Sequence, residues 1–518
     1  MVKLTNLSFL LMLSFSSAYK ILVVFPYPGK SHTILGEGFV KHLVKAGHEI
    51  TYITPIPIKN PPKGLRQIDV SSNKEIFEVM SHVLSFEMVL KKEIDLTDMR
   101  SMVRIVYDIA NQTLWNENVQ KLMHDPNEEF DLVIAEWLYT ELYCGFAAVF
   151  NCPFIWSSSM DPHGLVLELI DEHPNPAYTT NHVSSFEAPF TFSQRVEELW
   201  GIIYTKYVKW AYLNDHENQI FREGYGPAVA KRGRALPSLY EVSHNASLMF
   251  GNSHFSSGRP VRLPQNYIPI AGYHIDDEVK PLPKDIQDIM DSAQHGVIYF
   301  SMGSMIKSSS MPDEIKQGFL KMFGSLKQTV IWKFEEVLPN LPKNVHILKW
   351  APQQSILAHP NCLLFISHGG LLSTSEALHY GVPIIGIPMF ADQFINVDRA
   401  MKKGFALKVD IVEDMTVHLK AAIEEILGNP RYHERMKELS FIYHHRTVTP
   451  GQAILHWVDH VIKTRGALHL RSPALDVPFY QKIYLDLITL IAVATIVLFR
   501  IAKRLVCKSA VTKKVKKN

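Results

Sequence analysis

The chain has 518 residues, of which 47% are hydrophobic, and its net charge is +2. This length exceeds what a single core supports, so we expect two or more domains. The near-neutral charge excludes a general nucleic-acid binder. The four cysteines, at positions 144, 152, 362 and 507, have neither zinc nor disulfide-framework spacing, so we expect the core to hold the fold.

The first 18 residues read MVKLTNLSFLLMLSFSSA, in which a lysine precedes a leucine- and phenylalanine-rich run that ends in small residues. This pattern predicts a secretory signal peptide that is cleaved after Ala18. A buried first strand is the alternative interpretation.

A strand–helix–strand pattern follows this segment. Ile21–Phe25 is an apolar run ended by prolines and a glycine, a helical pattern comes next, and Ile50–Thr54 is a second strand. Phe130–Trp137 and Cys152–Ser159 predict further buried strands. The pattern indicates a parallel α/β sheet. Two sequons, at Asn111 and Asn245, would accept glycans if this part of the chain is lumenal.

Residues 160–240 are rich in aromatic side chains and histidine. We interpret them as helices and loops that either wall an apolar pocket or simply pack. The proline-rich residues 261–290 predict a linker. A second strand–helix alternation follows, with strands expected at 297–301, 329–333, 345–348, 363–367 and 383–387.

The stretch SHGGLLSTSEA (367–377) follows a predicted strand and enters a predicted helix. Gly369 and Gly370 allow backbone amides to approach a ligand closely. A helix N-terminus with free amides binds phosphate. The alternative is a plain capping box, because Ser373 and Glu376 have the capping-box spacing.

The neighbours of this stretch favour the phosphate interpretation. Trp350 offers an aromatic plane that can stack on a base. Gln353 and Glu376 can hydrogen-bond to ribose hydroxyls, while Asp392 and Gln393 offer groups suited to a sugar. Since ligands of open parallel sheets bind at the carboxyl ends of strands, we expect these side chains to line one nucleotide-sugar site.

The C-terminal region predicts a membrane span. The run 487–499 is uncharged, and extension to 483–502 reaches the length of a transmembrane helix. The basic residues from Lys503 to Lys517 place the tail in the cytosol, so we expect a type I membrane protein. An amphipathic interfacial helix is the alternative. The ending KVKKN is either a dilysine-type retrieval signal for the endoplasmic reticulum or a plain basic flank.

The expected organisation is therefore as follows: signal peptide 1–18, first domain 19–260, linker 261–290, second domain 291–465, juxtamembrane segment 466–482, transmembrane helix 483–502 and basic tail 503–518.

The run WAPQQSILAHPNCLLFISHGGLLSTSEALHYGVPIIGIPMFADQ (350–393) resembles the signature of the UDP-glycosyltransferase family. The resemblance extends over nearly the whole chain and is strongest to membrane-bound animal members of insect type. It implies an α/β protein of GT-B fold, in which two Rossmann-like domains face a cleft. It also implies that the first domain binds the acceptor and the second binds the UDP-sugar, with no metal and no further cofactor.

The resemblance also assigns roles to residues of the second domain. Trp350 would stack on uracil, Gln353 and Glu376 would bind the ribose, and Asp392 and Gln393 would bind the sugar. The diphosphate would be met by Ser304, His368, Gly370 and Ser373. Lys333 stands where many vertebrate relatives have arginine, and Leu372 stands where many relatives have asparagine.

The first domain would supply the catalytic base. The family places a histidine after the first strand, and His32 stands there in the segment PGKSH. Relatives carry FDVxxAD, whose aspartate holds that histidine. Here the segment is FDLVIAE, so Glu136 takes the position with one more methylene.

The resemblance thus implies an inverting transfer of a hexose, most simply glucose, from a UDP-sugar to a hydroxyl of a small lipophilic acceptor such as a phenol, steroid, pigment or plant toxin. Glucuronic acid or galactose remains an alternative donor sugar. A non-catalytic nucleotide-sugar-binding membrane subunit is a second hypothesis, although it would be expected to lose the base. A dinucleotide oxidoreductase is disfavoured because no G-x-G-x-x-G follows a first strand. A serine hydrolase is disfavoured because G-x-S-x-G is absent.

Overall fold

The computed structural model describes residues 18–76, 78, 86–91, 99–181, 184–305 and 307–515. The predicted signal peptide, apart from Ala18, lies outside these residues, as do the last three residues of the basic tail. The described chain forms two units, residues up to Leu470 and residues from Arg471 onward.

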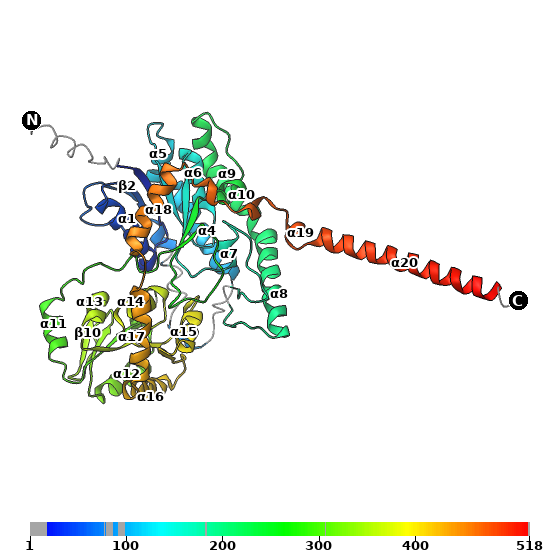
Figure 1. Cartoon of the computed structure of the whole chain (residues 1–518). Helices are drawn as coiled ribbons and strands as arrows, with labels where there is room; N and C mark the ends of the chain where they lie inside the picture. Colours follow the sequence, from blue (N-terminus) through cyan, green and yellow to red (C-terminus); the bar gives the residue numbers. More distant parts are fainter. Residues whose placement is uncertain are drawn as a thin grey trace, which may run out of the picture. The chain divides into compact units, whose positions relative to one another are not determined.

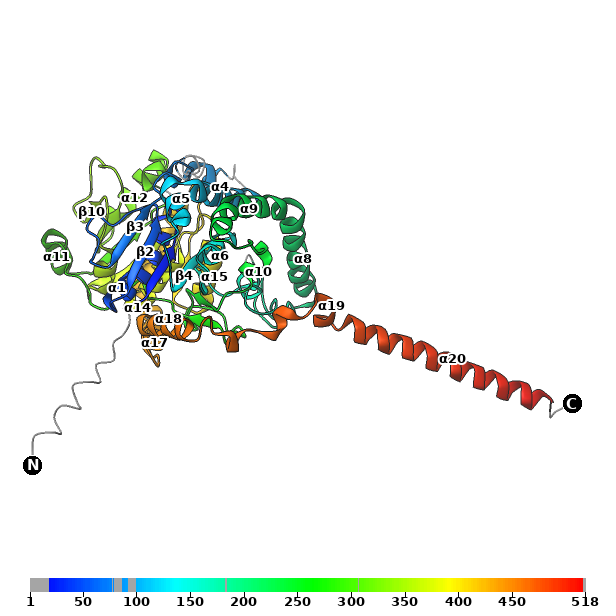
Figure 2. The same ribbon diagram turned by 90° about the horizontal axis from the view of Figure 1, so that it is seen from above.

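The first unit contains two parallel sheets, as the strand–helix alternation predicts (Figure 1). The first sheet has the order β3-β2-β1-β4-β5-β6-β7, and Figure 2 shows β3 and β2 side by side. Its strands are β1 (Lys20–Val24), β2 (Glu49–Thr54), β3 (Leu65–Asp69), β4 (Leu132–Trp137), β5 (Phe154–Ser158), β6 (Leu248–Gly251) and β7 (Tyr267–Pro269).

The second sheet has the order β10-β9-β8-β11-β12-β13, and its neighbouring strands pair in parallel. Its strands are β8 (Val297–Ser301), β9 (Thr329–Lys333), β10 (Val345–Leu348), β11 (Cys362–Ser367), β12 (Ile384–Gly386) and β13 (Ala406–Lys408). The inner strands are buried, which is why they appear in the sequence as short continuous apolar runs, whereas the edge strands β10 and β13 are only partly buried.

Helices connect and cover the strands. Those that follow the first sheet along the chain are α1 (Lys30–Lys45), α3 (Phe86–Leu90), α4 (Met99–Trp115), α5 (Glu117–His124), α6 (Gly145–Phe150), α7 (Gly164–Leu167), α8 (Phe192–Val208), α9 (Asn214–Lys231) and α10 (Leu239–Ser243). Those of the second are α11 (Lys284–Asp291), α12 (Asp313–Gly324), α13 (Gln353–Ala358), α14 (Leu371–Tyr380), α15 (Gln393–Lys402), α16 (Met415–Gly428) and α17 (Arg431–His444). The last helix of this unit, α18 (Pro450–Lys463), packs on the first sheet.

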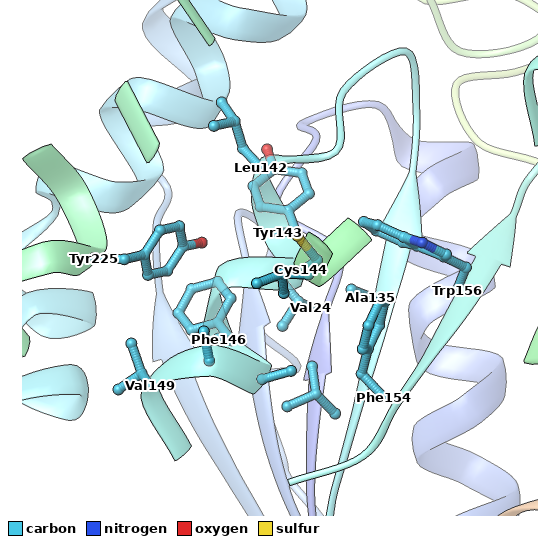
Figure 3. Packing of buried hydrophobic residues seen from close by; sticks show 14 of the residues in the cluster. Val24, Ala135, Leu142, Tyr143, Cys144, Phe146, Val149, Phe154, Trp156 and Tyr225 are labelled. Atoms are coloured by element: carbon cyan, nitrogen blue, oxygen red, sulfur yellow. The ribbon is translucent and has the colours of Figure 1, made fainter. Parts of the chain in front are cut away.

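The first sheet packs against α6 and α9 through large apolar side chains (Figure 3). Trp156 of β5 is fully buried, and its ring meets Phe154 edge to face, with centroids 5.2 Å apart. Phe146 of α6 and Tyr225 of α9 pack in the same way at 5.4 Å. Burying side chains of this size stabilises the fold by about 1.5–3 kcal/mol each, so this core holds β4 rigidly behind the site.

The chain crosses between the two sheets twice. The first crossing follows β7, a strand of the first sheet that lies inside the range predicted as linker. The second follows α17, after which α18 returns and packs on α1 of the first half, as Figure 1 also shows. The two crossings touch, because the Arg446 guanidinium donates a 2.8 Å hydrogen bond to the Ala271 carbonyl.

The second unit contains α19 (Phe479–Lys482) and the long α20 (Leu485–Val515). The stretch Leu485–Val506 of α20, 22 residues long, contains an 18-residue window with a mean hydropathy of 2.2 and is long and apolar enough to cross a membrane. At about 1.5 Å per residue it reaches about 33 Å, which matches the hydrocarbon core of a bilayer. This apolar helix, which overlaps the span predicted at 483–502, suggests a C-terminal membrane anchor.

Candidate active site

The pairing of β1 with β4 brings His32 to Glu136. Val24, the last residue of β1, lies opposite Ala135 of β4, so the helix that follows β1 begins beside Glu136. The His32 Nδ1 atom lies 2.5 Å from the Glu136 Oε1 atom. Glu136 is 1% exposed, whereas His32 is 18% exposed, so the ring faces outward from a buried carboxylate. The chain thus forms a His–carboxylate pair of the kind that works as an oriented base.

Electrostatics favour the imidazolium form of His32. Burial alone would lower the pKa of His32, but the charge and hydrogen bond of Glu136, together with Asp392, outweigh burial and raise that pKa above 6.5. The second oxygen of Glu136 is buried and has no hydrogen-bond partner among the described residues. The carboxylate is therefore directed at His32 alone. A proton taken up by the ring is stabilised at this position.

Asp392 reaches the same site from the second half. It lies between β12 and α15, and its carboxylate is close enough to His32 for the two to influence each other's pKa. Burial raises the pKa of Asp392, although the hydrogen bond from Asn396 at 2.8 Å opposes the rise. The Asn396 amide also donates to the Gly369 carbonyl at 3.2 Å. Asn396 thus links Asp392 to the turn at Gly369 and Gly370, which we call the glycine turn. The sequence analysis missed Asn396, although its position four residues after Asp392 indicates a contact between the two side chains on one helix.

The glycine turn leaves the start of α14 without a side-chain cap. Gly370 is the N-cap residue of α14, and no described side chain caps this helix. Ser373 therefore lies inside the first turn, and the Glu376 carboxylate accepts hydrogen bonds from Gln353 and Gln354. The capping-box interpretation is thus wrong for this helix. Uncapped amides at a helix N-terminus form a site for an anion such as phosphate.

His368 packs beside this helix start in a pocket that only glycines permit. A Cβ atom at Gly303 would lie 2.6 Å from the His368 ring, and one at Gly370 would lie 2.5 Å from it. Burial, and then the charge of Lys333, lowers the pKa of His368 to about 4. The ring is therefore neutral at pH 7. It can present an N–H group to a phosphate without carrying charge.

Gln353, Ser373 and Glu376 form one hydrogen-bonded group. The Gln353 amide donates to Glu376 at 2.6 Å and to the Ser373 hydroxyl at 3.2 Å. Tyr299 donates to the Gln353 carbonyl at 3.2 Å, an orienting contact that the sequence analysis missed. Trp350 lies just before this group and is 60% exposed, so its ring is free to stack on a planar ligand.

Other predicted residues lie nearby but face differently than expected. The Lys333 ammonium bonds the Gly303 carbonyl at 3.0 Å and Glu335 at 2.5 Å, so it supports the loop under His368. The Gln393 carbonyl accepts from the Met389 amide at 2.9 Å, which leaves only its amide group for a ligand.

Two further predicted positions have distinct surroundings. Ser304 is exposed in the loop after β8. Leu372, which replaces a polar residue of many relatives, packs against the apolar core of the first half.

A recess beside Asp392 is lined by both halves. Asp161 from the first half and Arg399 of α15 form a buried ion pair across it. An apolar cluster also adjoins His32, because the ring of Tyr27 meets the His32 ring at 4.6 Å between centroids. Tyr27 packs with Val106, Ile109, Ile76, Ile105, Leu138 and Met305.

Among the described residues, no three His, Cys, Asp or Glu side chains gather to hold a metal ion.

The two sequons differ in their surroundings. Asn245 is exposed in the turn before β6, whereas Ser247 of the same sequon is buried. Asn111 lies within α4, and the threonine of its sequon, Thr113, is fully buried and bonded to Asn73 at 2.7 Å.

Two parallel sheets, one with an uncapped helix start and the other with a His–carboxylate pair, fit the architecture of a GT-B nucleotide-sugar transferase. Solved glycosyltransferases have this fold. CalG4, the calicheamicin glycosyltransferase, matches with a TM-score of 0.56 at 15% identity over 86% of this chain and 98% of its own. The glycotransferase of kitacinnamycin matches with a TM-score of 0.55 at 16% identity, over 86% of this chain and 98% of its own.

Sequence comparison identifies the family. The family described as "UDP-glucoronosyl and UDP-glucosyl transferase" matches residues 20–518. UDP-glucosyltransferase 2 from Dactylopius coccus is 33% identical over 97% of this chain and 95% of its own length. UDP-glucuronosyltransferase 2B19 from Macaca fascicularis is 29% identical over 96% and 94%, respectively. The chain belongs to the UDP-glycosyltransferase family and is an enzyme that transfers sugar from a UDP-sugar to a small acceptor.

Proposed function

We propose that the enzyme transfers glucose, with inversion at the anomeric carbon, to a hydroxyl group of a small lipophilic acceptor. The observation that carries this proposal is the 2.5 Å contact between His32 and the buried Glu136, opposite Asp392. His32 Nε2 removes the acceptor proton while Glu136 holds the Nδ1–H tautomer. The acceptor oxygen attacks the anomeric carbon from the face opposite UDP, the bond to the diphosphate breaks, and UDP leaves.

The leaving diphosphate is stabilised by the second half of the enzyme in this mechanism. The amides at the start of α14 and the neutral His368 donate hydrogen bonds to it, with Ser373 in the same turn and Ser304 opposite. Trp350 stacks on uracil, and the group of Gln353 and Glu376 binds the ribose. Asp392 and the amide of Gln393 bind sugar hydroxyls, while Lys333 acts by holding the loop at Gly303.

Charge near Asp392 supports a neutral sugar. Arg399, the guanidinium of the adjoining recess, is already neutralised by Asp161. A glucuronate carboxylate bound there would be repelled by the negative charge of Asp392. Arg399 would not offset this repulsion, because its charge is already paired with Asp161. The Dactylopius relative that is named a glucosyltransferase favours the same sugar. The apolar group around Tyr27 would hold the acceptor ring next to His32, which suits phenols, steroids, pigments and plant toxins.

We also propose a location for the enzyme. The anchor helix and the basic tail fit a type I protein of the endoplasmic reticulum, with residues up to Leu470 in the lumen. In that compartment Asn245 and Asn111 would receive glycans before the chain folds, because Ser247 and Thr113, the hydroxyl residues of the two sequons, are buried in the folded protein.

The test is transfer by microsomes that express the full chain. UDP-glucose, UDP-glucuronic acid and UDP-galactose are supplied separately with phenol and steroid acceptors, and the product anomer is assigned by NMR. His32→Ala should abolish transfer, whereas His418→Ala, a control on an exposed helix face, should leave it intact. Preference for UDP-glucuronic acid would refute the sugar assignment. Transfer that survives His32→Ala would refute the base. UDP binding without transfer from any donor would favour the non-catalytic subunit.

A further inference from the structure

The helix α8 presents its large apolar side chains to the outside. It begins at Phe192, capped by Thr191, and continues through a π-helical turn at Lys209–Leu213. Both views place α8 along the outside of the first half, away from its sheet (Figures 1 and 2). Eight apolar or aromatic side chains of this segment are at least 46% exposed: Phe192, Val196, Leu199, Trp200, Ile203, Tyr204, Tyr207 and Trp210.

These side chains lie on one face of the helix. Seven of them recur at i, i+4, i+7, i+8, i+11, i+15 and i+18 from Phe192. At about 100° per residue they fall within an arc of about 100°, and Tyr204 lies at its edge. No charged residue falls inside that arc between Phe192 and Trp210. We call these eight residues the α8 face.

The side of α8 that meets the protein is mostly polar, with Val208 as its one buried apolar side chain. Glu198 is 2% exposed and accepts a 2.6 Å hydrogen bond from the backbone N–H of Asn181. Lys206 pairs with Glu168 at 2.9 Å, and Lys209 pairs with the buried Glu141 at 2.8 Å. A surface helix of a water-soluble domain buries its apolar side and exposes its polar side. The reversed arrangement in α8 indicates a partner that offers an apolar environment.

We propose that the α8 face rests in the interfacial layer of the lipid bilayer that the C-terminal helix spans. Its composition fits this environment, because Trp and Tyr concentrate where an apolar interior meets water. Two tryptophans and two tyrosines belong to the face. An isolated patch of this kind on a soluble protein would instead favour association in water.

The length of the tether favours the membrane over another partner. Fourteen residues, 471–484, separate the end of the first unit from the start of α20. At no more than about 3.5 Å per residue they reach about 50 Å, so the first unit cannot leave the vicinity of the bilayer. A surface held this close meets the lipid at high effective concentration, and a single shallow face is then enough for stable contact. The bilayer thereby gains a second attachment that involves no transmembrane residue.

The test uses the placement of tryptophan in the chain. The chain has eight tryptophans, and none lies beyond Trp457, so tryptophan fluorescence does not report on the anchor helix. The full chain is reconstituted into vesicles of phosphatidylcholine with brominated or ordinary acyl chains. We expect bromine to quench the wild-type emission. The double variant Trp200→Phe, Trp210→Phe, which keeps the face apolar, should lose at least about half of the quenched component.

The matched control is the double variant Trp115→Phe, Trp350→Phe. These two tryptophans are 52% and 60% exposed but lie outside α8, so their replacement should leave the quenched component unchanged. Equal quenching in wild type and the α8 variant would overturn the proposal, as would quenching lost only in the control. Because phenylalanine preserves the apolar character, a folding defect is not expected; an unchanged thermal midpoint verifies this.

A second experiment separates lipid from a second copy of the chain. A protease site replaces Pro473–Asp476 in the full-length protein, which is cut after reconstitution. The first unit should stay with the vesicles, and Trp200→Ser with Trp210→Ser should lower its bound-to-free ratio by roughly tenfold or more. Phe441→Ser with Val417→Ser, at two exposed apolar sites of other helices, should not lower it. Release of the wild-type unit from the vesicles would refute lipid contact. If the released unit formed dimers and the α8 variant did not, the α8 face would bind a second copy of the chain instead.

Discussion

The change Glu136→Gln tests the pair that carries the proposed mechanism. It removes one negative charge from a buried position and keeps nearly the same volume. The structure gives Glu136 a single side-chain partner among the described residues, the His32 ring at 2.5 Å. The variant should therefore affect His32 and little else. Its glutamine can still accept one hydrogen bond but no longer stabilises the imidazolium.

The size of the effect follows from that one contact. A hydrogen bond to a charged group contributes about 1.5–3 kcal/mol. If all of it is lost in the transition state, kcat/KM falls by roughly 10- to 150-fold, because each 1.36 kcal/mol is a factor of ten. A larger loss, up to about 10⁴-fold, would mean that glutamine also selects the wrong tautomer. The KM for UDP-sugar should stay unchanged, because no donor contact is removed.

The pH profile identifies the base. The raised pKa of His32 means that the ring is protonated, and the enzyme inactive, below that pKa; kcat/KM should therefore rise with pH through it. Without the Glu136 charge the rise should move to lower pH. Glu136→Asp keeps the charge but, shorter by about 1.5 Å, cannot keep the 2.5 Å contact without movement. Its rise should lie between those of the other two enzymes.

The assay is the initial rate of transfer from a saturating UDP-sugar across a series of buffers of equal ionic strength. If Glu136→Gln leaves the midpoint of the rise in place while the rate falls, the titrating group is not His32. If both rate and midpoint stay at the wild-type values, the pair has no part in catalysis.

Three further predictions rest on other contacts. Gly303→Ala should raise the KM for UDP-sugar at least about tenfold, because a Cβ atom 2.6 Å from the His368 ring must displace it; an unchanged KM would contradict the role of that ring. Asp161→Asn should destabilise the fold by about 3–5 kcal/mol, since it leaves Arg399 buried without its partner; denaturant unfolding measures this, and the double variant with Arg399→Met should recover most of the loss. The pKa values of His368 and His379 are both lowered to about 4, so their contribution to stability is full above pH 6.5 and is lost as pH falls toward 4. The thermal midpoint should drop over that interval, and His379→Gln should flatten the drop.

Much of the fold was predictable because buried parallel strands have a simple sequence pattern. The strands at 297–301, 329–333 and 345–348 lie where the apolar runs predict them. The edge strand β3 was missed because it carries Arg66 and Gln67 and is only partly buried, so its residues do not form an apolar run.

The candidate site was predictable in its residue types but not in their orientations. His32 and Glu136 are 104 residues apart, and only the family resemblance linked them. The direction of Gln393, whose carbonyl faces the backbone of its own loop, depends on tertiary packing. So does the outward direction of the α8 face, because periodicity defines a face without indicating which side meets the core.

The contact between Arg446 and Ala271 has a mechanical consequence. The two segments that join the halves of the first unit lie side by side there, so any hinge between the halves would pass through this one place. A rotation of the halves about these two adjacent segments would change the distance between His32 and Asp392, which lie in opposite halves. Entry of the donor and alignment of the base would then be governed by a single coordinate, the opening angle.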